Sequence, residues 1–377
     1  MSGVVQLIWS DSLLDYRLSE DHPLQPLRVQ LAVELIRSSG LIDFCELVPP
    51  RPATDAEIAL CHSPEYISIV DRLSSPATLS QVPVPLIFDS GFGSADNPIA
   101  DGMHRASAAV VGASLTAAEA IDSGAALHSF TPAGGLHHAH RDKASGFCVY
   151  NDIAVACAWL RSKGHRVACV DIDVHHGDGT QDLFYADPEV LTVSLHESGR
   201  YLFPGTGFPN EVGVGGAVGT AVNLPLLPYT WDEPWLAAFE AVVPPLLRAF
   251  RPTVLVTQCG CDTHLLDPLA HLQCSTRIWP RIGRRFHELA HELCDGRWLA
   301  TGGGGYAIRE VVPRAWALLF AEMVERPDLV LAQLDPAPFP PVEEAQARIW
   351  SQLSRDLAML SRTLGMELEL PPRPNSY

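Results

Sequence analysis

The stretch RVACVDIDVHHGDGTQDLFY, from Arg166 to Tyr185, indicates the fold class of this 377-residue chain. It begins with a short apolar run, Val167 to Val170, which predicts a buried β-strand. Asp171, Asp173 and His175 follow at intervals of two residues. Because residues two apart on a strand share a face, two carboxylates and an imidazole should converge there. Buried charges are costly unless they are paired or bound to metal, so this strand end predicts a binding site.

Strands and helices alternate along the rest of the chain. Further strands are expected at Val4 to Trp9, Ala126 to Phe130, Val190 to Leu195, Thr253 to Gln258 and Arg297 to Ala300. Helices are expected at Met103 to Ala125, Val149 to Lys163, Trp231 to Phe250 and Ile278 to Cys294, and an extended segment at Pro83 to Phe88. This alternation predicts an α/β fold with a mostly parallel central sheet.

The domain organisation follows from where this alternation stops. One catalytic domain is expected over residues 1–325, followed by a C-terminal extension over residues 326–377. Within the extension, a proline-rich linker from Asp335 to Pro341 precedes a helix from Val342 to Leu364. We expect this helix to pack on the same domain.

The composition indicates which binding partners and which cellular compartment to expect. The net charge is −18, from 44 acidic and 26 basic residues, with no block of lysine or arginine. This balance argues against nucleic acid and anionic membranes as partners. The nine cysteines form no CxxC pair and indicate a reduced, cytoplasmic protein, and no apolar run is long enough to span a bilayer. Nothing in the sequence indicates an oligomeric state.

Reactive residues follow four of the expected strands. They are His137 and His138, the group from Asp171 to Asp178, the pair Asp262 and Asp267, and Tyr306. Because the carboxyl ends of parallel strands lie at one edge of a sheet, we expect these groups to form a single site.

The residue types at this edge suit a metal-dependent hydrolase. Such a site needs about three protein ligands and an open position for water. Asp173 and His175 provide two ligands from one strand end, and Asp267 is the best candidate for the third. This set predicts a zinc-like site.

The remaining charged groups suit proton transfer. His137 and His138 are candidates for the general base, and each would need a carboxylate to fix its tautomer. Asp171 and Asp178 are left over from the metal ligands. Pairing His137 with Asp171 and His138 with Asp178 gives each histidine one of these carboxylates. Tyr306 follows four glycines, where its hydroxyl could donate to a developing oxyanion.

In this order, the motifs resemble those of the histone deacetylase superfamily, and most those of its bacterial acetoin utilization branch. The matching segments are Gly134 to Ala139, Ser145 to Asp152, Asp171 to Gly179, Phe203 to Gly207, Asp262 to Pro268 and Gly302 to Tyr306. The resemblance implies an arginase/deacetylase-like three-layer α/β/α fold and one catalytic Zn²⁺, or Fe²⁺. It also implies hydrolysis of acetyl, or other short acyl, groups on lysine side chains of proteins.

The resemblance also assigns residues to roles. Asp173, His175 and Asp267 would hold the metal, His137 and His138 would form the histidine dyad, and Tyr306 would donate to the oxyanion. The implied substrate-binding residues are Asp96 at the rim, Phe147 and Phe203 as tunnel walls, Gly146 and Gly304 as lining, and Cys274. The implied site for structural K⁺ or Na⁺ consists of Asp171, Asp173, His175, Ser194 and Leu195. Many relatives carry a larger apolar residue near Cys274, so we expect a pocket open to longer acyl groups.

Two other activities are compatible with parts of the sequence. Hydrolysis of acetylpolyamines uses identical chemistry, so small acylated amines remain an alternative substrate class. His287 to His291 reads HELAH, the HExxH motif of zinc proteases. The same helix has a structural explanation, because Ile282, Phe286 and Leu289 form an apolar stripe.

Overall fold

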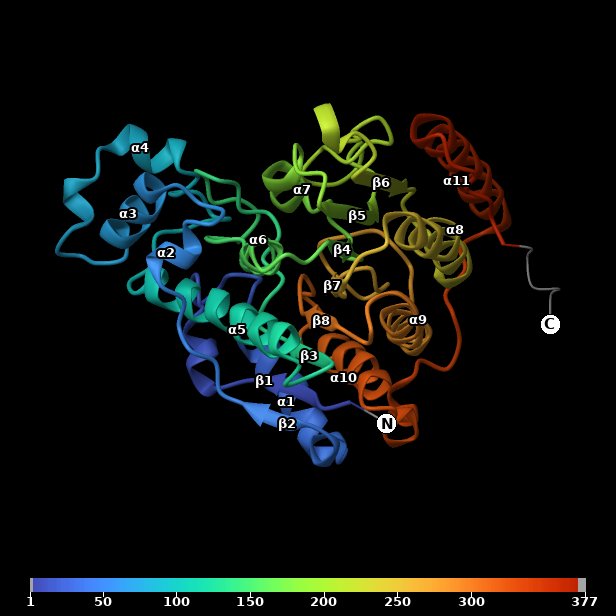
Figure 1. Cartoon of the computed structure of the whole chain (residues 1–377), viewed down its shortest axis with the longest axis horizontal. Coiled ribbons are helices and arrows are strands. Elements are labelled where there is room, and N and C mark those ends of the chain that lie inside the picture. The colour runs from blue at the N-terminus through green and yellow to red at the C-terminus, as the bar shows by residue number, and fades with distance from the viewer. Residues whose placement is uncertain (1–2, 372–377) are drawn as a thin grey trace.

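The structure is a computed structural model, and it describes residues 3–371. Eight strands form one sheet in the order β2-β1-β3-β8-β7-β4-β5-β6 (Figure 1). The strands are β1 (Val5–Ile8), β2 (Glu46–Val48), β3 (His128–Thr131), β4 (Val167–Asp171), β5 (Val190–Glu197), β6 (Ala221–Leu226), β7 (Val254–Gln258) and β8 (Trp298–Thr301). Every neighbouring pair is parallel.

The central strands are buried along their whole length and mostly apolar because helices cover both faces of the sheet. All residues of β4 (VACVD) and β7 (VLVTQ) are buried. In the register of the sheet, Val167 of β4 pairs with Val190 of β5 on one side and with Val254 of β7 on the other. The stretch from Arg166 to Tyr185 therefore supplies a central strand, β4.

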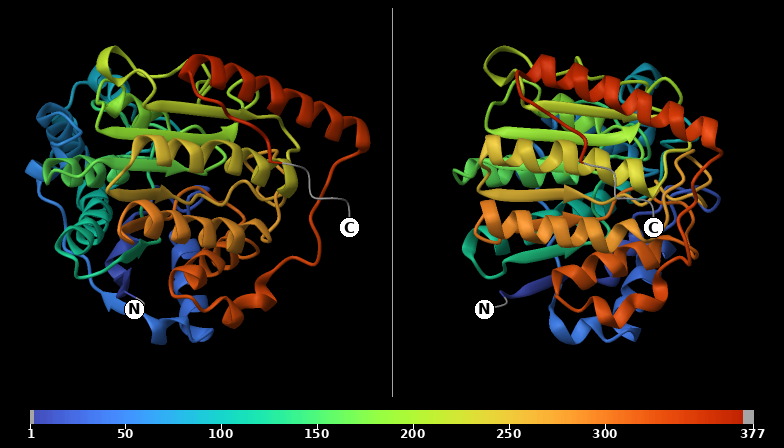
Figure 2. Two further views of the ribbon diagram at one scale, coloured as in Figure 1. Left: turned by 45° about the vertical axis from the view of Figure 1, so that its right-hand side comes forward. Right: turned by 90° about the vertical axis from the view of Figure 1, so that its right-hand side faces the viewer.

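Two helical layers enclose the sheet (Figures 1 and 2). One contains α5 (Met103–Ser123), α6 (Asp152–Ser162) and α7 (Asp178–Phe184); the other contains α1 (Leu27–Ser38), α8 (Asp232–Phe250), α9 (Ile278–Leu293) and α10 (Val312–Met323). The short helices α2 (Asp55–Ile58), α3 (Pro64–Leu73) and α4 (Val84–Asp89) lie beyond α5. This arrangement confirms the three-layer α/β/α prediction.

The C-terminal extension contains α11 (Glu343–Leu364), which packs against α8 and β6. Trp350 of α11 meets Trp231, at the start of α8, edge to face with ring centroids 6.2 Å apart. The amphipathic pattern of the helix explains this contact, because Ile349, Leu353 and Leu357 are buried.

One predicted element is wrong. The segment from Pro83 to Phe88 is not extended but begins helix α4. Pro85 occupies the first turn, where a helix tolerates proline because the N–H groups there have no intrahelical partner. The alternation of proline with apolar residues resembled a strand. The structure also adds β2 and β6, which the sequence pattern did not reveal.

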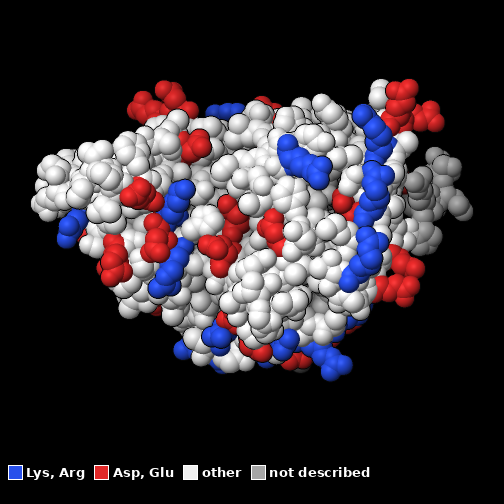
Figure 3. All heavy atoms as spheres, turned by 90° about the horizontal axis from the view of Figure 1, so that it is seen from above, with Lys and Arg blue, Asp and Glu red and all other residues white. Residues whose placement is uncertain are grey.

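Charged side chains of both signs are dispersed over the face in Figure 3, with a row of basic side chains on the side where α11 lies. Arg348, Arg355 and Arg362 are exposed on α11 at intervals of seven residues, so helix periodicity aligns them. Among residues 3–371, no helix is long and apolar enough to cross a membrane.

Candidate active site

The order of the strands explains why the predicted residues meet. β3, β8, β7 and β4 are consecutive neighbours in the sheet, and each leads at its carboxyl end into one group of reactive residues. His137 and His138 follow β3, Tyr306 follows β8, Asp262 and Asp267 follow β7, and Asp173 and His175 follow β4. Four adjacent strand ends therefore converge on one place.

Each histidine of the dyad is oriented by its own carboxylate. The Nδ1 atom of His137 lies 2.6 Å from Oδ2 of Asp171, and Nδ1 of His138 lies 2.6 Å from Oδ1 of Asp178. The Nε2 atoms of the two rings face each other at 3.0 Å. The structure thus has both pairings that the sequence predicted.

The two rings differ in protonation. Burial favours a neutral His137, but the charges of Asp171 and Asp173 outweigh burial and raise its pKa to about 9. Burial and the neighbouring charge on His137 lower the pKa of His138 to about 4. At neutral pH, His137 therefore carries a proton and His138 can accept one.

Asp173, His175 and Asp262 form the compact group beside the dyad. One ligand atom from each of these buried residues lies within 4.8 Å of the other two. The Nδ1 atom of His175 is 3.1 Å from Oδ1 of Asp173 and 3.1 Å from Oδ2 of Asp262. Since β4 ends at Asp171, Asp173 and His175 lie in the turn after the strand and not on it.

Asp267 lies on the loop that leaves Asp262. Its Oδ2 atom accepts a hydrogen bond from the backbone N–H of Tyr306 at 2.7 Å, and Oδ1 accepts from the N–H of Leu269 at 3.0 Å. Burial raises its pKa to about 6, and burial together with the charge of Asp173 raises the pKa of Asp262 to about 7. The site therefore holds more negative charge than it can accommodate well in a buried environment.

This chemistry fits a bound cation. Carboxylate oxygens and an imidazole nitrogen are ligands of Zn²⁺ and Fe²⁺, and a divalent ion would compensate the excess of buried carboxylates. The structure also supports the orientation of one ligand, because Oδ2 of Asp173 accepts from the N–H of Gly304 at 2.7 Å and from Nε2 of Gln258 at 2.8 Å. The other oxygen of that carboxylate is left facing His175.

The glycine turn after β8 lies directly against the acidic group. A Cβ atom on Gly304 would come within 2.0 Å of Oδ2 of Asp262, so no other residue fits there without displacing the carboxylate. Arg28 from α1 supports the turn from behind, donating from Nη1 to the carbonyl oxygens of Gly303 at 2.6 Å and Gly305 at 3.3 Å. Burial and the carboxylates of Asp262 and Asp173 raise the pKa of Tyr306 well above its usual value, so the phenol keeps its proton.

Aromatic rings stand on two sides of this group. Phe147 packs edge to face on Tyr306, with centroids 5.7 Å apart, and Phe203 packs edge to face on His138 at 5.0 Å. Phe203 is 44% exposed, so the ring reaches from the catalytic groups to solvent. Gly146 adjoins His138, where a Cβ atom would come within 2.4 Å of the imidazole.

The predicted rim residue Asp96 is exposed, and His22 lies between it and Phe147. The Nε2 atom of His22 is 3.2 Å from the carbonyl oxygen of Asp96, and the His22 ring meets Phe147 edge to face at 4.5 Å. His22 therefore links the rim loop to the aromatic wall.

The remaining predicted residues lie farther back. Cys274 is 0% exposed, and its Sγ atom is 4.0 Å from the carbonyl oxygen of Thr230. Its role in acyl-chain selection stays a prediction. Ser194 pairs with Asp171 across β5 and β4, and both border an enclosed cavity of about 10 Å³. Leu195, the next residue of β5, is also fully buried.

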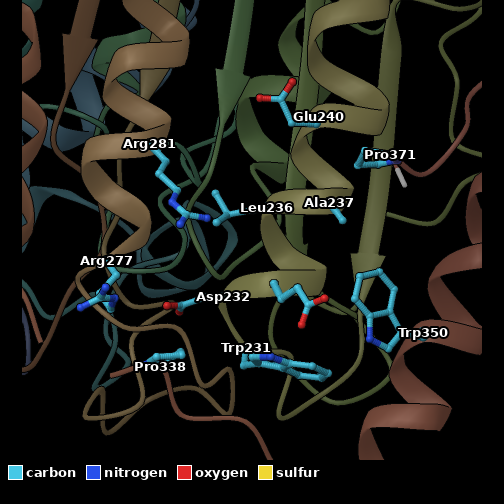
Figure 4. A pocket seen from close by; sticks show the side chains of 11 residues that line it. Trp231, Asp232, Leu236, Ala237, Glu240, Arg277, Arg281, Pro338, Trp350 and Pro371 are labelled. Carbon is cyan, nitrogen blue, oxygen red and sulfur yellow. The ribbon is translucent and has the colours of Figure 1, made fainter. Parts of the chain in front are cut away.

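A larger cavity of about 420 Å³ lies elsewhere, between α8, α9 and the C-terminal extension (Figure 4). Apolar residues such as Trp231 and Leu236 line it together with Arg277 and Arg281. Its lining includes none of the predicted catalytic residues.

Sequence reasoning missed several residues that shape the site. Gln258 and Arg28 carry no motif of their own. Gln258 donates to the carboxylate of Asp173, and Arg28 donates to the backbone of the distant glycine turn. His22 stands in an unremarked Asp-His-Pro segment. Asp262 was recognised as a strand-end residue but not as part of the compact group with Asp173 and His175. Its position four residues after the end of the buried strand β7 was the available signal.

Comparisons with known proteins agree with this geometry. Residues 22–323 match the model of the histone deacetylase domain family. The chain is 43% identical to the acetoin utilization protein AcuC of Bacillus subtilis (strain 168) over 317 residues, which cover 84% of this chain and 81% of that protein. It is 40% identical to the AcuC protein of Staphylococcus aureus (strain MRSA252) over 321 residues, which cover 85% of this chain and 82% of the relative. With AcuC of Staphylococcus xylosus the identity is 38% over 325 residues, or 86% and 83% of the two chains.

Proposed function

The chain belongs to the histone deacetylase family of hydrolases, and from this premise we propose that it removes acetyl groups from lysine side chains of proteins. The reaction would add water to the amide and release acetate and a free amine. The observation that carries this proposal is the juxtaposition of the dyad with the acidic group. His137 and His138, held by Asp171 and Asp178, lie beside Asp173, His175 and Asp262 at one sheet edge.

We assign Asp173, His175 and Asp267 as the metal ligands, with Asp262 as the competing candidate for the third position. When bound, the metal would polarise the amide carbonyl and lower the pKa of a water molecule. The two candidates can be separated, since Asp267→Asn should reduce metal affinity more than Asp262→Asn. The opposite ranking in a zinc titration would make Asp262 the ligand.

The chain's own residues would move the proton and stabilise the developing charge. His138 is neutral at pH 7, and Asp178 occupies its Nδ1, so Nε2 would accept the proton of the attacking water once it no longer accepts from Nε2 of His137. It would later return that proton to the leaving amine. His137, protonated and 3.0 Å away, would mainly supply positive charge. The Tyr306 hydroxyl would donate to the oxyanion.

The aromatic walls suit the substrate. Acetylation removes the charge of lysine, so its side chain becomes an apolar stem that Phe147 and Phe203 can cover. Gly146 and Gly304 keep the lining free of side chains. Asp96, exposed beside His22, would hold the substrate backbone at the rim.

Three further assignments belong to the same proposal. The structural K⁺ or Na⁺ would lie among Asp171, Asp173, His175, Ser194 and Leu195, near the small cavity behind the site. The nine free cysteines fit a reducing cytoplasm. Because the relatives are named for acetoin utilization, we place the acylated protein in acetoin or acetyl-CoA metabolism.

Turnover on a substrate panel tests the proposal. The panel contains acetyl-lysine peptides, longer acyl-lysine peptides and acetylpolyamines, each assayed with Zn²⁺ and with Fe²⁺. We expect kcat/KM to be highest for acetyl-lysine peptides, and Tyr306→Phe serves as the low-activity control. Preference for acetylpolyamines would replace lysine as the substrate, and no turnover on any member would overturn the deacetylase assignment.

A further inference from the structure

Three histidines outside the catalytic site meet at the opposite end of β3. His128 is the first residue of β3, whereas His287 and His291 lie one helical turn apart on the same face of α9. The ring centroid of His128 is 4.7 Å from that of His287 and 5.2 Å from that of His291, and the two α9 rings are 4.7 Å apart. One nitrogen of each ring lies within 4.8 Å of the other two.

The donor atoms of this three-histidine cluster are available. His128 is 2% exposed, and its Nδ1 atom has no hydrogen-bond partner among the described residues. A buried polar atom left without a partner is unfavourable, so this nitrogen is available to a ligand. The Nδ1 atom of His287 lies 3.1 Å from the carbonyl oxygen of Glu322, which fixes the ring and leaves Nε2 free to coordinate.

The cluster is also accessible. The three histidines line an open cavity of about 570 Å³ together with Phe44, Met323 and Glu325. His291 is exposed, so an ion can enter from solvent and keep water molecules in its remaining coordination positions.

We propose that His128, His287 and His291 form a second metal site, for a divalent transition-metal ion such as Zn²⁺. Imidazole nitrogens are preferred donors for this class of ion, and three of them leave room for a solvent ligand. The ion would connect α9 to the amino end of β3, the strand whose other end leads to His137 and His138. This proposal rests on the cluster alone and is independent of the deacetylase assignment.

The same contacts explain the HExxH motif without a protease. In that motif the glutamate acts as the base beside the metal. Here the side chain of Glu288 is 51% exposed, and Oε2 pairs with Nη1 of Arg285 at 3.0 Å. The third histidine comes from a strand of the sheet, not from the chain after the helix. The motif therefore supplies two ligands to a binding site and no general base.

Metal stoichiometry of the full-length protein tests the site. Chelator-treated protein is dialysed against micromolar Zn²⁺, and bound zinc per chain is measured by mass spectrometry. We expect two ions in the unaltered protein, one in Asp173→Ala, one in His291→Ala and none in the double variant. His291→Ala removes an exposed ligand and should weaken the second binding event by about 100-fold.

Two further measurements complete the experiment. Glu288→Gln, on the same helix turn, is the matched control and should still bind two ions. In the Asp173→Ala background, Zn²⁺ should raise Tm by about 2–4 °C, and His128→Asn or His291→Ala should abolish that rise. Two ions retained in His291→Ala, no ion in Asp173→Ala, or loss of the second ion in Glu288→Gln would each overturn the proposal.

Discussion

The two proposed metal sites lie at opposite edges of the sheet and differ in how firmly their donors are held. At the carboxyl edge, Asp173 accepts hydrogen bonds from Gly304 and Gln258, and Asp262 accepts one from the N–H of Val174 at 2.9 Å. At the amino edge, His287 is held by its contact with the carbonyl oxygen of Glu322.

Charge separates the two sites as well. The carboxyl edge combines buried carboxylates with a histidine dyad, whereas the amino edge offers three imidazoles, with Glu325 in the cavity lining and Glu288 paired with Arg285. Metal ligands by themselves are therefore enough to form a binding site. Catalysis also needs oriented bases, an acid and a fixed geometry around the reacting atoms.

The largest expected effect comes from Asp173→Ala. This change removes a ligand whose other oxygen anchors the glycine turn, so kcat/KM should fall by at least about 10³-fold. Zinc bound per chain should fall from two to one. If activity survives with both ions bound, the two edges do not have the separate roles described above.

Tyr306→Phe should be the next largest change. Loss of a donor to the oxyanion lowers kcat by about 10²–10³-fold. The ring stays packed on Phe147, so metal content and Tm should remain those of the unaltered protein. A Tyr306→Phe variant that loses metal instead would show that the phenol is needed for the site's structure.

Asp178→Asn sharpens the contrast between orienting a base and holding a metal. The His138 ring would lose the carboxylate 2.6 Å from Nδ1, and kcat should fall by about 10–100-fold with both ions retained. Steady-state kinetics and zinc content measured on the same sample check this. If this variant simply loses metal, Asp178 helps to hold the metal and does not only orient His138.

The smallest effect concerns pH. His138 must be neutral to accept a proton, so activity should fall on acidification towards its pKa of about 4. Asp178 raises that pKa, and Asp178→Asn should therefore move the acid limb of kcat/KM to lower pH, by less than about one unit. A shift to higher pH would show that another group controls the limb. His291→Ala, the control from the amino edge, should leave the limb unchanged.

Much of the catalytic edge could be predicted because the information is local. A short apolar run followed by Asp171, Asp173 and His175 identifies a strand end, and four such ends in a parallel sheet share an edge. The pairings of His137 with Asp171 and His138 with Asp178 followed from counting charged groups. Helix α4 was missed because proline occurs both in extended segments and in the first turn of a helix, so the sequence alone does not distinguish them.

The sequence by itself determined the α/β class and the family. It also predicted which residues form the catalytic edge, because each motif follows a strand in the chain. Only the tertiary structure decided that β3, β8, β7 and β4 are neighbours, and that Arg28 and Gln258 support the site from distant segments. The tertiary structure also shows which residue lies beside the two histidines of the HExxH motif. The partner of His287 and His291 is His128, more than a hundred residues earlier, and no local spacing encodes a contact that only sheet and helix packing create.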